Sequence, residues 1–104
     1  MNQAARKIVI SVELFGLARV ISDRREITLE LEPGASDGSV SGKEIVSALA
    51  IQEPRLVGSI IRPDGVWLNE GQVANVNGRR YLTEPDERLF DGDRLLLLAN
   101  AAGG

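Results

Sequence analysis

The chain alternates between segments with a two-residue hydrophobic period and one segment with a helical period. Residues 7–15 place apolar side chains at every second position, and residues 26–32 repeat the pattern with Glu and Thr on the other face. Such alternation predicts strands with one buried face. Pro33-Gly34 ends the second segment, and we expect the two strands to form an antiparallel pair joined by an irregular loop over residues 16–25.

One segment in the middle of the chain carries the signals of a helix. Residues 35–42 are rich in Ser and Gly and predict a loop. Ser41, with Glu44 three residues later, forms a capping-box sequence that marks the start of a helix. The apolar positions that follow have helical spacing and predict a buried stripe made by Ile45, Val46, Ala48 and Leu49. Pro54 closes this segment.

Residues 55–72 are the least regular part of the pattern. Residues 55–62 predict a helical turn or a weak strand, residues 63–65 (Pro-Asp-Gly) a turn, and residues 66–68 a short strand. This stretch and residues 33–43 are long connections. Each of them either carries a specific contact or is a tolerated insertion.

The last third of the chain returns to strands. Residues 73–77 predict a strand that runs into a turn at Asn77-Gly78, and Asp91-Gly92-Asp93 predicts a second tight turn. Residues 94–99 follow with four consecutive Leu, which predicts a strand covered on both faces and central in the sheet, beside the first strand. With a right-handed crossover, this indicates an α+β chain with the β-grasp (ubiquitin-like) fold: a mixed four- to five-stranded sheet with one main helix packed across it.

Composition narrows the range of functions. The 104 residues suffice for one domain over residues 1–104 with a modest core. The 15 acidic and 12 basic residues give a net charge of −3 without a basic run, which argues against nucleic acid as a partner. No apolar stretch is long enough to span a membrane, and residues 1–10 lack a signal-peptide core. We therefore expect a soluble, cytoplasmic protein with no membrane partner.

The residue types that the chain lacks exclude most enzyme chemistry. It has no Cys and no His, which removes thiol nucleophiles, the commonest general base and the commonest ligands of transition metals. Lys7 and Lys43 are the only lysines, and no Ser lies in a Gly-x-Ser-x-Gly sequence. Asp91 and Asp93 flank a glycine and are expected to hydrogen-bond to the turn backbone rather than to hold a metal. We expect no catalytic activity, no metal and no bound cofactor.

The sequence finishes with Ala101-Ala102-Gly103-Gly104, and packing does not account for the glycine pair. Gly has no side chain and loses the most conformational entropy on ordering, so two glycines favour a thin, flexible peptide. Such a tail, over residues 99–104, can enter a narrow slot and place the carboxylate of Gly104 beside another protein's catalytic groups. The alternative is a frayed end without a function.

Four segments, taken in order, resemble a known family. They are Val12–Arg19 (VELFGLAR), Val76-Asn77-Gly78, Asp91-Gly92-Asp93 and Gly103-Gly104. Together they are similar to the ubiquitin-like sulfur carriers of the molybdopterin synthase small-subunit type, to which the thiamine-pathway sulfur carrier is related. The chain departs from the family pattern where proline often follows the last strand, since Asn100 and Ala101 stand there.

The resemblance implies a definite chemistry at Gly104. In this family an E1-like adenylating enzyme uses ATP to adenylate the terminal carboxylate, and a sulfurtransferase supplies the sulfur for a C-terminal thiocarboxylate. Gly103, Ala102 and Ala101 are then the residues that thread into the partner enzymes. The thiocarboxylate delivers its sulfur inside the synthase.

The same resemblance implies a docking surface. By their positions in the motifs, Phe15 and Leu98 correspond to an apolar patch that contacts the large subunit of the synthase, with Arg80 or Tyr81 at its border. The alternative is core packing, for Phe15 at a strand end and for Leu98 in the central strand. A contiguous, exposed pair would favour docking.

Several functions stay open at this point. The favoured one is a sulfur carrier for molybdenum-cofactor assembly. The alternatives are a sulfur carrier for another pathway (thiamine or amino acid), a ubiquitin-like modifier joined to lysine amines, and a β-grasp binding module with an idle glycine pair. The acceptor of the sulfur is set by the partner and not by this chain.

Overall fold

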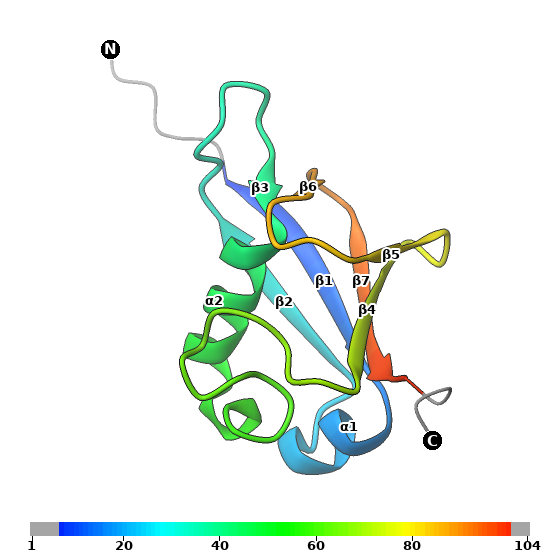
Figure 1. The fold of residues 1–104 in the computed structure, drawn as a ribbon. Coiled ribbons are helices and arrows are strands. Elements are labelled where there is room, and N and C mark those ends of the chain that lie inside the picture. Colours follow the sequence, from blue (N-terminus) through cyan, green and yellow to red (C-terminus); the bar gives the residue numbers. More distant parts are fainter. Residues whose placement is uncertain (1–6, 101–104) are drawn as a thin grey trace.

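The computed structural model describes residues 7–100. One long helix lies across a sheet, with short elements at both ends of the sheet (Figure 1). The elements in chain order are β1 (Ile8–Leu14), α1 (Gly16–Ser22), β2 (Glu26–Leu31), β3 (Val40–Ser41), α2 (Gly42–Gln52), the 3-10 helix η1 (Pro54–Leu56), β4 (Gln72–Val76), β5 (Arg80–Leu82), β6 (Arg88–Leu89) and β7 (Arg94–Ala99).

Five of the strands form one mixed sheet in the order β2-β1-β7-β4-β5. β1 pairs antiparallel with β2 and parallel with β7, and β4 pairs antiparallel with both β7 and β5. The last strand therefore lies in the centre, next to the first, as the leucine run predicts. This strand order with a helix packed across the sheet is the β-grasp arrangement, and the predicted α+β fold class is confirmed.

One face of the sheet is buried against α2. Val12 of β1 lies opposite both Ile27 of β2 and Leu95 of β7, and directly opposed residues point to the same face. The alternate residues of these strands thus converge on one apolar layer. The sheet residues of this core are Ile8, Ile10, Val12, Leu14, Ile27, Leu29, Ala74, Val76, Leu82, Leu95 and Leu97.

The helix α2 starts where the capping sequence predicts. Ser41 Oγ accepts a hydrogen bond from the Glu44 N–H at 3.1 Å, and Glu44 Oε2 accepts one from the Ser41 N–H at 3.1 Å. These bonds satisfy backbone groups that the first turn of a helix leaves unpaired. Ile45, Val46 and Leu49 are buried against the sheet, so the predicted stripe is the packed face of the helix.

The connection from η1 to β4 folds into a compact loop. The Asn69 N–H donates to the Ile60 carbonyl at 2.8 Å, which draws the two ends of the loop together. Ile60, Ile61 and Leu68 are buried, so the loop adds its own apolar side chains to the core. The strand predicted at residues 66–68 does not form, because Leu68 makes only an isolated bridge to Ile61.

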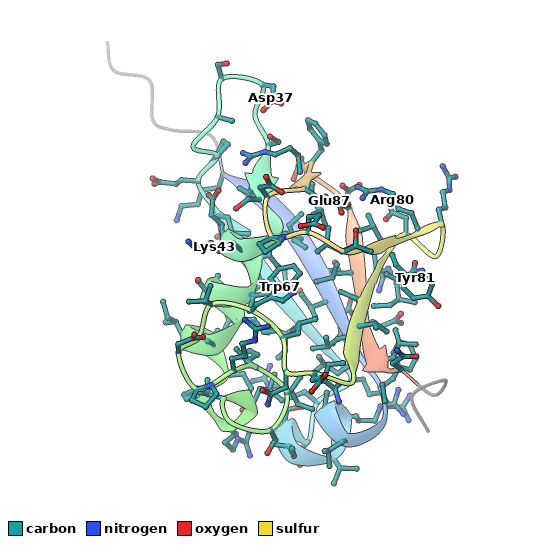
Figure 2. The ribbon with its side chains drawn as sticks, in the orientation of Figure 1. Asp37, Lys43, Trp67, Arg80, Tyr81 and Glu87 are labelled. Carbon is teal, nitrogen blue, oxygen red and sulfur yellow. The ribbon has the colours of Figure 1, made fainter. Side chains whose placement is uncertain are left out.

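Gly42, the first residue of α2, permits a close contact with Trp67 and Leu82. A Cβ at Gly42 would lie 3.0 Å from Leu82 Cδ2 and 3.2 Å from Trp67 Cη2, and Figure 2 shows the Trp67 ring beside the helix. We expect Gly42→Leu to lower the free energy of unfolding by about 2 kcal/mol, through overpacking. Gly34→Leu is the matched control, since its Cβ would meet nothing closer than 3.9 Å. Thermal melting followed by circular dichroism measures both, and equal losses would contradict a special role for Gly42.

The helix α1, the short strands β3 and β6 and the edge strand β5 have no counterpart in the sequence pattern. The helix α1 replaces the irregular loop predicted over residues 16–25, and β3 pairs with β6. The helix α1 buries only Ala18 and Ser22, too little for a hydrophobic stripe, and its ends are set by Gly16 and Asp23, both with φ of 58°. The β3–β6 ladder has only two residue pairs, which is too short for a period to show.

Candidate functional site

The leucine run of β7 divides between the two faces of the sheet. Leu95 and Leu97 are buried toward α2, whereas Leu96 and Leu98 are only half-buried on the opposite face. The prediction that this strand is covered on both faces is therefore wrong. Pairing with β1 and β4 makes β7 central, and within residues 7–100 its outer side is left half-exposed. We call the side of the sheet opposite α2 the open face.

Apolar side chains cross three strands of the open face at the level of Leu98. Val73 of β4 is the direct cross-strand partner of Leu98. On the other side, Leu14 pairs with Leu97, so the next residue, Phe15, lies beside Leu98. Because directly opposed residues share a face, Phe15, Leu98 and Val73 form one row. The two predicted docking residues are therefore neighbours on an accessible surface.

A second row lies beside the first. Leu96 of β7 and Tyr81 of β5 pair with Asn75 of β4 from opposite sides, and Tyr81 is 57% exposed. Together the two rows make an apolar surface on the open face, of the kind that marks protein interaction sites. We define the open-face patch as Phe15, Val73, Leu96, Leu98 and Tyr81.

Phe15 is positioned by its backbone and by Arg19. Its backbone is extended (φ −125°, ψ 157°), and its N–H donates to the Leu97 carbonyl at 3.1 Å, which continues the parallel ladder past β1. The Arg19 guanidinium carbon lies 5.9 Å from the centroid of the Phe15 ring, within cation–π range. Arg19 Nε also donates to the Leu14 carbonyl at 3.3 Å. The patch therefore has a cationic group at this end.

The half of the open face formed by β1 and β2 is charged. Arg94 Nη1 lies 3.1 Å from Glu26 Oε2 and 3.7 Å from Glu13 Oε2, and Thr28 and Glu30 of β2 are exposed. Exposed ion pairs contribute little to stability, and these groups keep water on this half of the face. Burial by a partner is therefore favourable on the half that carries the open-face patch.

Arg80 does not lie in the open-face patch. It pairs with Val76, whose side chain points toward α2, so Arg80 lies on the opposite face of the sheet. Figure 2 shows its side chain beside Glu87, and Arg80 Nη1 donates to Glu87 Oε1 at 2.8 Å. The neighbouring Tyr81 points to the open face instead. Of the two residues expected at the border of the patch, the register places Tyr81 there.

The partners of Glu87 make its contribution to stability dependent on pH. The Thr83 hydroxyl, above all, and the N–H groups of Thr83 and Glu84 hydrogen-bond to its carboxylate and hold its pKa below the ordinary value of 4.5, with help from Arg80. A lowered pKa means stability that is present above pH 4.5 and lost as the pH falls through the folded pKa. We expect Glu87→Gln to be less stable than the wild type near neutral pH, with the difference shrinking in acid. Urea unfolding across this range tests it, and a constant difference would contradict it.

The last strand is tied to the sheet to its end. Ala99 lies opposite Gln72, and the Asn100 N–H donates to the Gly71 carbonyl at 2.7 Å. Ala99 and Asn100, the first two residues of the predicted flexible tail over residues 99–104, are therefore held by the sheet. The strand β7 ends at Ala99, at the end of the sheet that carries Phe15 and α1 (Figure 1). The predicted reactive and threading residues, Gly104, Gly103, Ala102 and Ala101, lie outside the described residues.

The acidic turn at residues 91–93 has the structural role that the sequence predicts. Asp91 Oδ1 accepts a hydrogen bond from the Val9 N–H at 2.7 Å, and Asp93 Oδ2 accepts one from the Phe90 N–H at 2.8 Å. Asp93 Oδ1 also accepts from Asn77 Nδ2 at 3.0 Å, which joins two turns. Between residues 7 and 100, no cluster of acidic side chains is suited to a metal ion.

The surface also has a depression away from the open face. An open depression of about 520 Å³ beside the loop before β4 is lined by Arg62, Trp67, Leu68, Asn69, Glu70 and Gln72. None of these is a nucleophile with an adjacent base, so the depression carries no catalytic arrangement.

None of the helices in residues 7–100 has the length and apolar character needed to cross a membrane.

Solved structures share this architecture. Small archaeal modifier protein 1 from Haloferax volcanii is similar over 92% of this chain and 99% of its own, with a TM-score of 0.71 and 22% identity. The protein of the same name from Methanosarcina acetivorans covers 95% of this chain and 99% of its own, with a TM-score of 0.72 and 20% identity. A putative molybdopterin converting factor, subunit 1, from Pyrococcus furiosus covers 88% and 97%, with a TM-score of 0.62 and 23% identity.

The fold is that of these small proteins. At such identities the similarity establishes the β-grasp fold, and it is consistent with the resemblance seen in the sequence motifs. No family model and no curated protein sequence matches the chain.

Proposed function

We propose that this chain is a ubiquitin-like sulfur carrier for molybdopterin synthesis and acts as the small subunit of the synthase. The reactive group is the carboxylate of Gly104, which an E1-like enzyme adenylates and a sulfurtransferase supplies with sulfur. The chain provides no catalytic side chain of its own, in keeping with its lack of His and Cys. In this proposal the chain is a protein substrate on which the adenylating enzyme and the sulfurtransferase act.

The position of β7 carries this proposal. The strand pairs with β1 on one side and with β4 on the other. Just after it, the Asn100 N–H donates a hydrogen bond to the Gly71 carbonyl. The residues that follow are Ala-Ala-Gly-Gly. The sheet therefore holds the chain up to Asn100, directly before the residues proposed to enter a partner. The open-face patch lies next to this point, so a partner that binds the patch has the tail beside it.

The chemistry at Gly104 requires activation because a carboxylate is a poor electrophile. A carboxylate oxygen attacks the α-phosphorus of ATP, and pyrophosphate leaves, which forms an acyl-adenylate. Hydrosulfide furnished by the sulfur donor then attacks the carbonyl carbon. The C–O bond to AMP breaks, AMP leaves with its electron pair, and one proton is released. The product is a thiocarboxylate, which serves as the sulfur nucleophile in the synthase.

A protein modifier is the second candidate. Two of the similar structures are small archaeal modifier proteins, and the same activated terminus could be transferred to a lysine amine instead of to sulfur. The putative molybdopterin converting factor subunit supports the first candidate. A sulfur carrier for another pathway, such as thiamine or amino-acid synthesis, uses the same terminal chemistry.

Intact-protein mass spectrometry tests the proposal. The wild-type chain and a variant that lacks Gly104 are incubated with ATP, an E1-like enzyme and a sulfur donor, both shown to be active on another carrier. We expect a mass gain that corresponds to replacement of one oxygen by sulfur in the wild type alone. An unmodified wild type would overturn the carrier proposal, and an isopeptide-linked adduct would favour the modifier.

A further inference from the structure

Asn75 is a polar residue in the middle of the open-face patch. Leu96 of β7 is its cross-strand partner on one side and Tyr81 of β5 on the other. Val73 precedes it by two positions on the same strand and therefore on the same face. The carboxamide of Asn75 is thus flanked by apolar and aromatic neighbours.

The carboxamide is not satisfied by its own chain. Asn75 Oδ1 is buried and, alone among side-chain atoms of residues 7–100, combines burial with the lack of any hydrogen-bond partner. A buried acceptor without a partner destabilises a protein, and native chains keep few of them. Asn is also unfavourable in strands, and an apolar residue would remove both costs. The stability of the free chain therefore does not explain why Asn stands at position 75.

Asn75 Nδ2 is not among the enclosed, unpartnered atoms of residues 7–100, so the NH2 group is the part of the carboxamide that a partner can reach. We propose that Asn75 Nδ2 donates a hydrogen bond to a carbonyl oxygen of the protein that docks on the open-face patch. This inference rests on the proposed function, in which that protein is the large subunit of the synthase. It makes Asn75 a specificity-determining residue of the docking surface.

The partner surface that would fit Asn75 is apolar and has one carbonyl oxygen near its centre. The apolar side chains of the open-face patch exclude water around this hydrogen bond, which raises the cost of a mismatch. A wholly apolar partner would bury the NH2 group unpaired and lose roughly tenfold or more in affinity. The polar residue therefore discriminates between partners that apolar contact alone would accept.

Calorimetric titration of the full chain with the purified synthase large subunit, together with thermal melting, tests this inference. Asn75→Leu keeps the size of the side chain and removes its polar groups. We expect its melting temperature to rise by roughly 4 °C or more, and its dissociation constant to rise about tenfold or more. Asn75→Asp, which has no donor, should also bind weakly. Thr28→Val, a matched change on the charged half of the open face, should bind like the wild type.

Each outcome decides a separate point. Asn75→Leu that is more stable but binds as tightly as the wild type overturns the inference and leaves the proposed function standing. Asn75→Leu that is less stable than the wild type shows a structural role and also overturns it. Failure of the wild type itself to bind the large subunit overturns the proposed function, and the inference with it.

Discussion

Gly104→Val should reduce adenylation and thiocarboxylate formation by roughly a hundredfold or more. In the proposed function the reacting carbon belongs to the main chain of Gly104, so a branched Cβ would stand directly beside the carboxylate that the adenylating enzyme would enclose. Gly also adopts backbone conformations with positive φ that Val cannot reach. Pyrophosphate release with an E1-like enzyme measures the adenylation step, and mass spectrometry measures the sulfur transfer.

Ala101→Val is the matched control for this experiment. It adds similar bulk three residues before the reacting carbon, and we expect a loss of less than about tenfold. We expect neither variant to change the melting temperature, and thermal melting of both separates a loss of activity from a loss of folding. Equal losses at both positions would show that the tail is recognised along its length and not at its terminus.

Leu97→Ala should lower the free energy of unfolding by about 3 kcal/mol, whereas Leu98→Ala should cost about 1 kcal/mol or less. The two residues are adjacent in β7, but Leu97 is 0% exposed in the core and Leu98 is half-buried on the open face. Truncation at Leu97 leaves a cavity, while truncation at Leu98 leaves a surface that solvent can reach. The fluorescence of Trp67, the only Trp, follows urea unfolding of both variants.

Binding to the proposed partner, the synthase large subunit, should rank the two variants in the opposite order. If the open-face patch is the docking surface, as proposed, Leu98→Ala should weaken binding because it removes apolar area from the patch. Leu97→Ala should bind like the wild type under conditions where it is folded. A large loss of stability in Leu98→Ala would show that Leu98 acts as a core residue, and it would contradict its proposed place in the docking surface.

The sheet was predictable because its long strands bury one face. β1 and β2 repeat their apolar residues at every second position, and the capping box at Ser41 and Glu44 marks the start of α2. The ambiguous segment over residues 55–62 begins inside the short helix η1, which spans Pro54–Leu56. β3, β5 and β6 have two or three residues each, and no period can be recognised over that length.

Solvent exposure within a hydrophobic run was not predictable. Four consecutive leucines look alike in the sequence, and only the position of α2 shows which two of them are covered. The face of the sheet on which Arg80 lies was also not predictable from the sequence. It depends on how many residues the turn after Val76 contains, since one more or one fewer would exchange the faces of Arg80 and Tyr81.

The candidate docking surface was only partly predictable. The motif positions of Phe15 and Leu98 identified two of its members, and pairing across β1, β7 and β4 identified the others. Asn75 gave one signal that went unused, namely a strand-disfavoured residue between Ala74 and Val76. Only the register with its neighbours shows that the carboxamide is enclosed.

The parallel pairing of β1 with β7 also determines when the fold can form during synthesis. The first and last strands of the sheet lie side by side, so the centre of the sheet cannot assemble until residues 94–99 have been made. Contacts so distant in sequence slow folding, because a long loop must close before they form. A nascent or truncated chain without β7 lacks the strand that joins the two halves of the sheet. A chain that contains Gly103 and Gly104 therefore also contains every strand that the sheet needs to close.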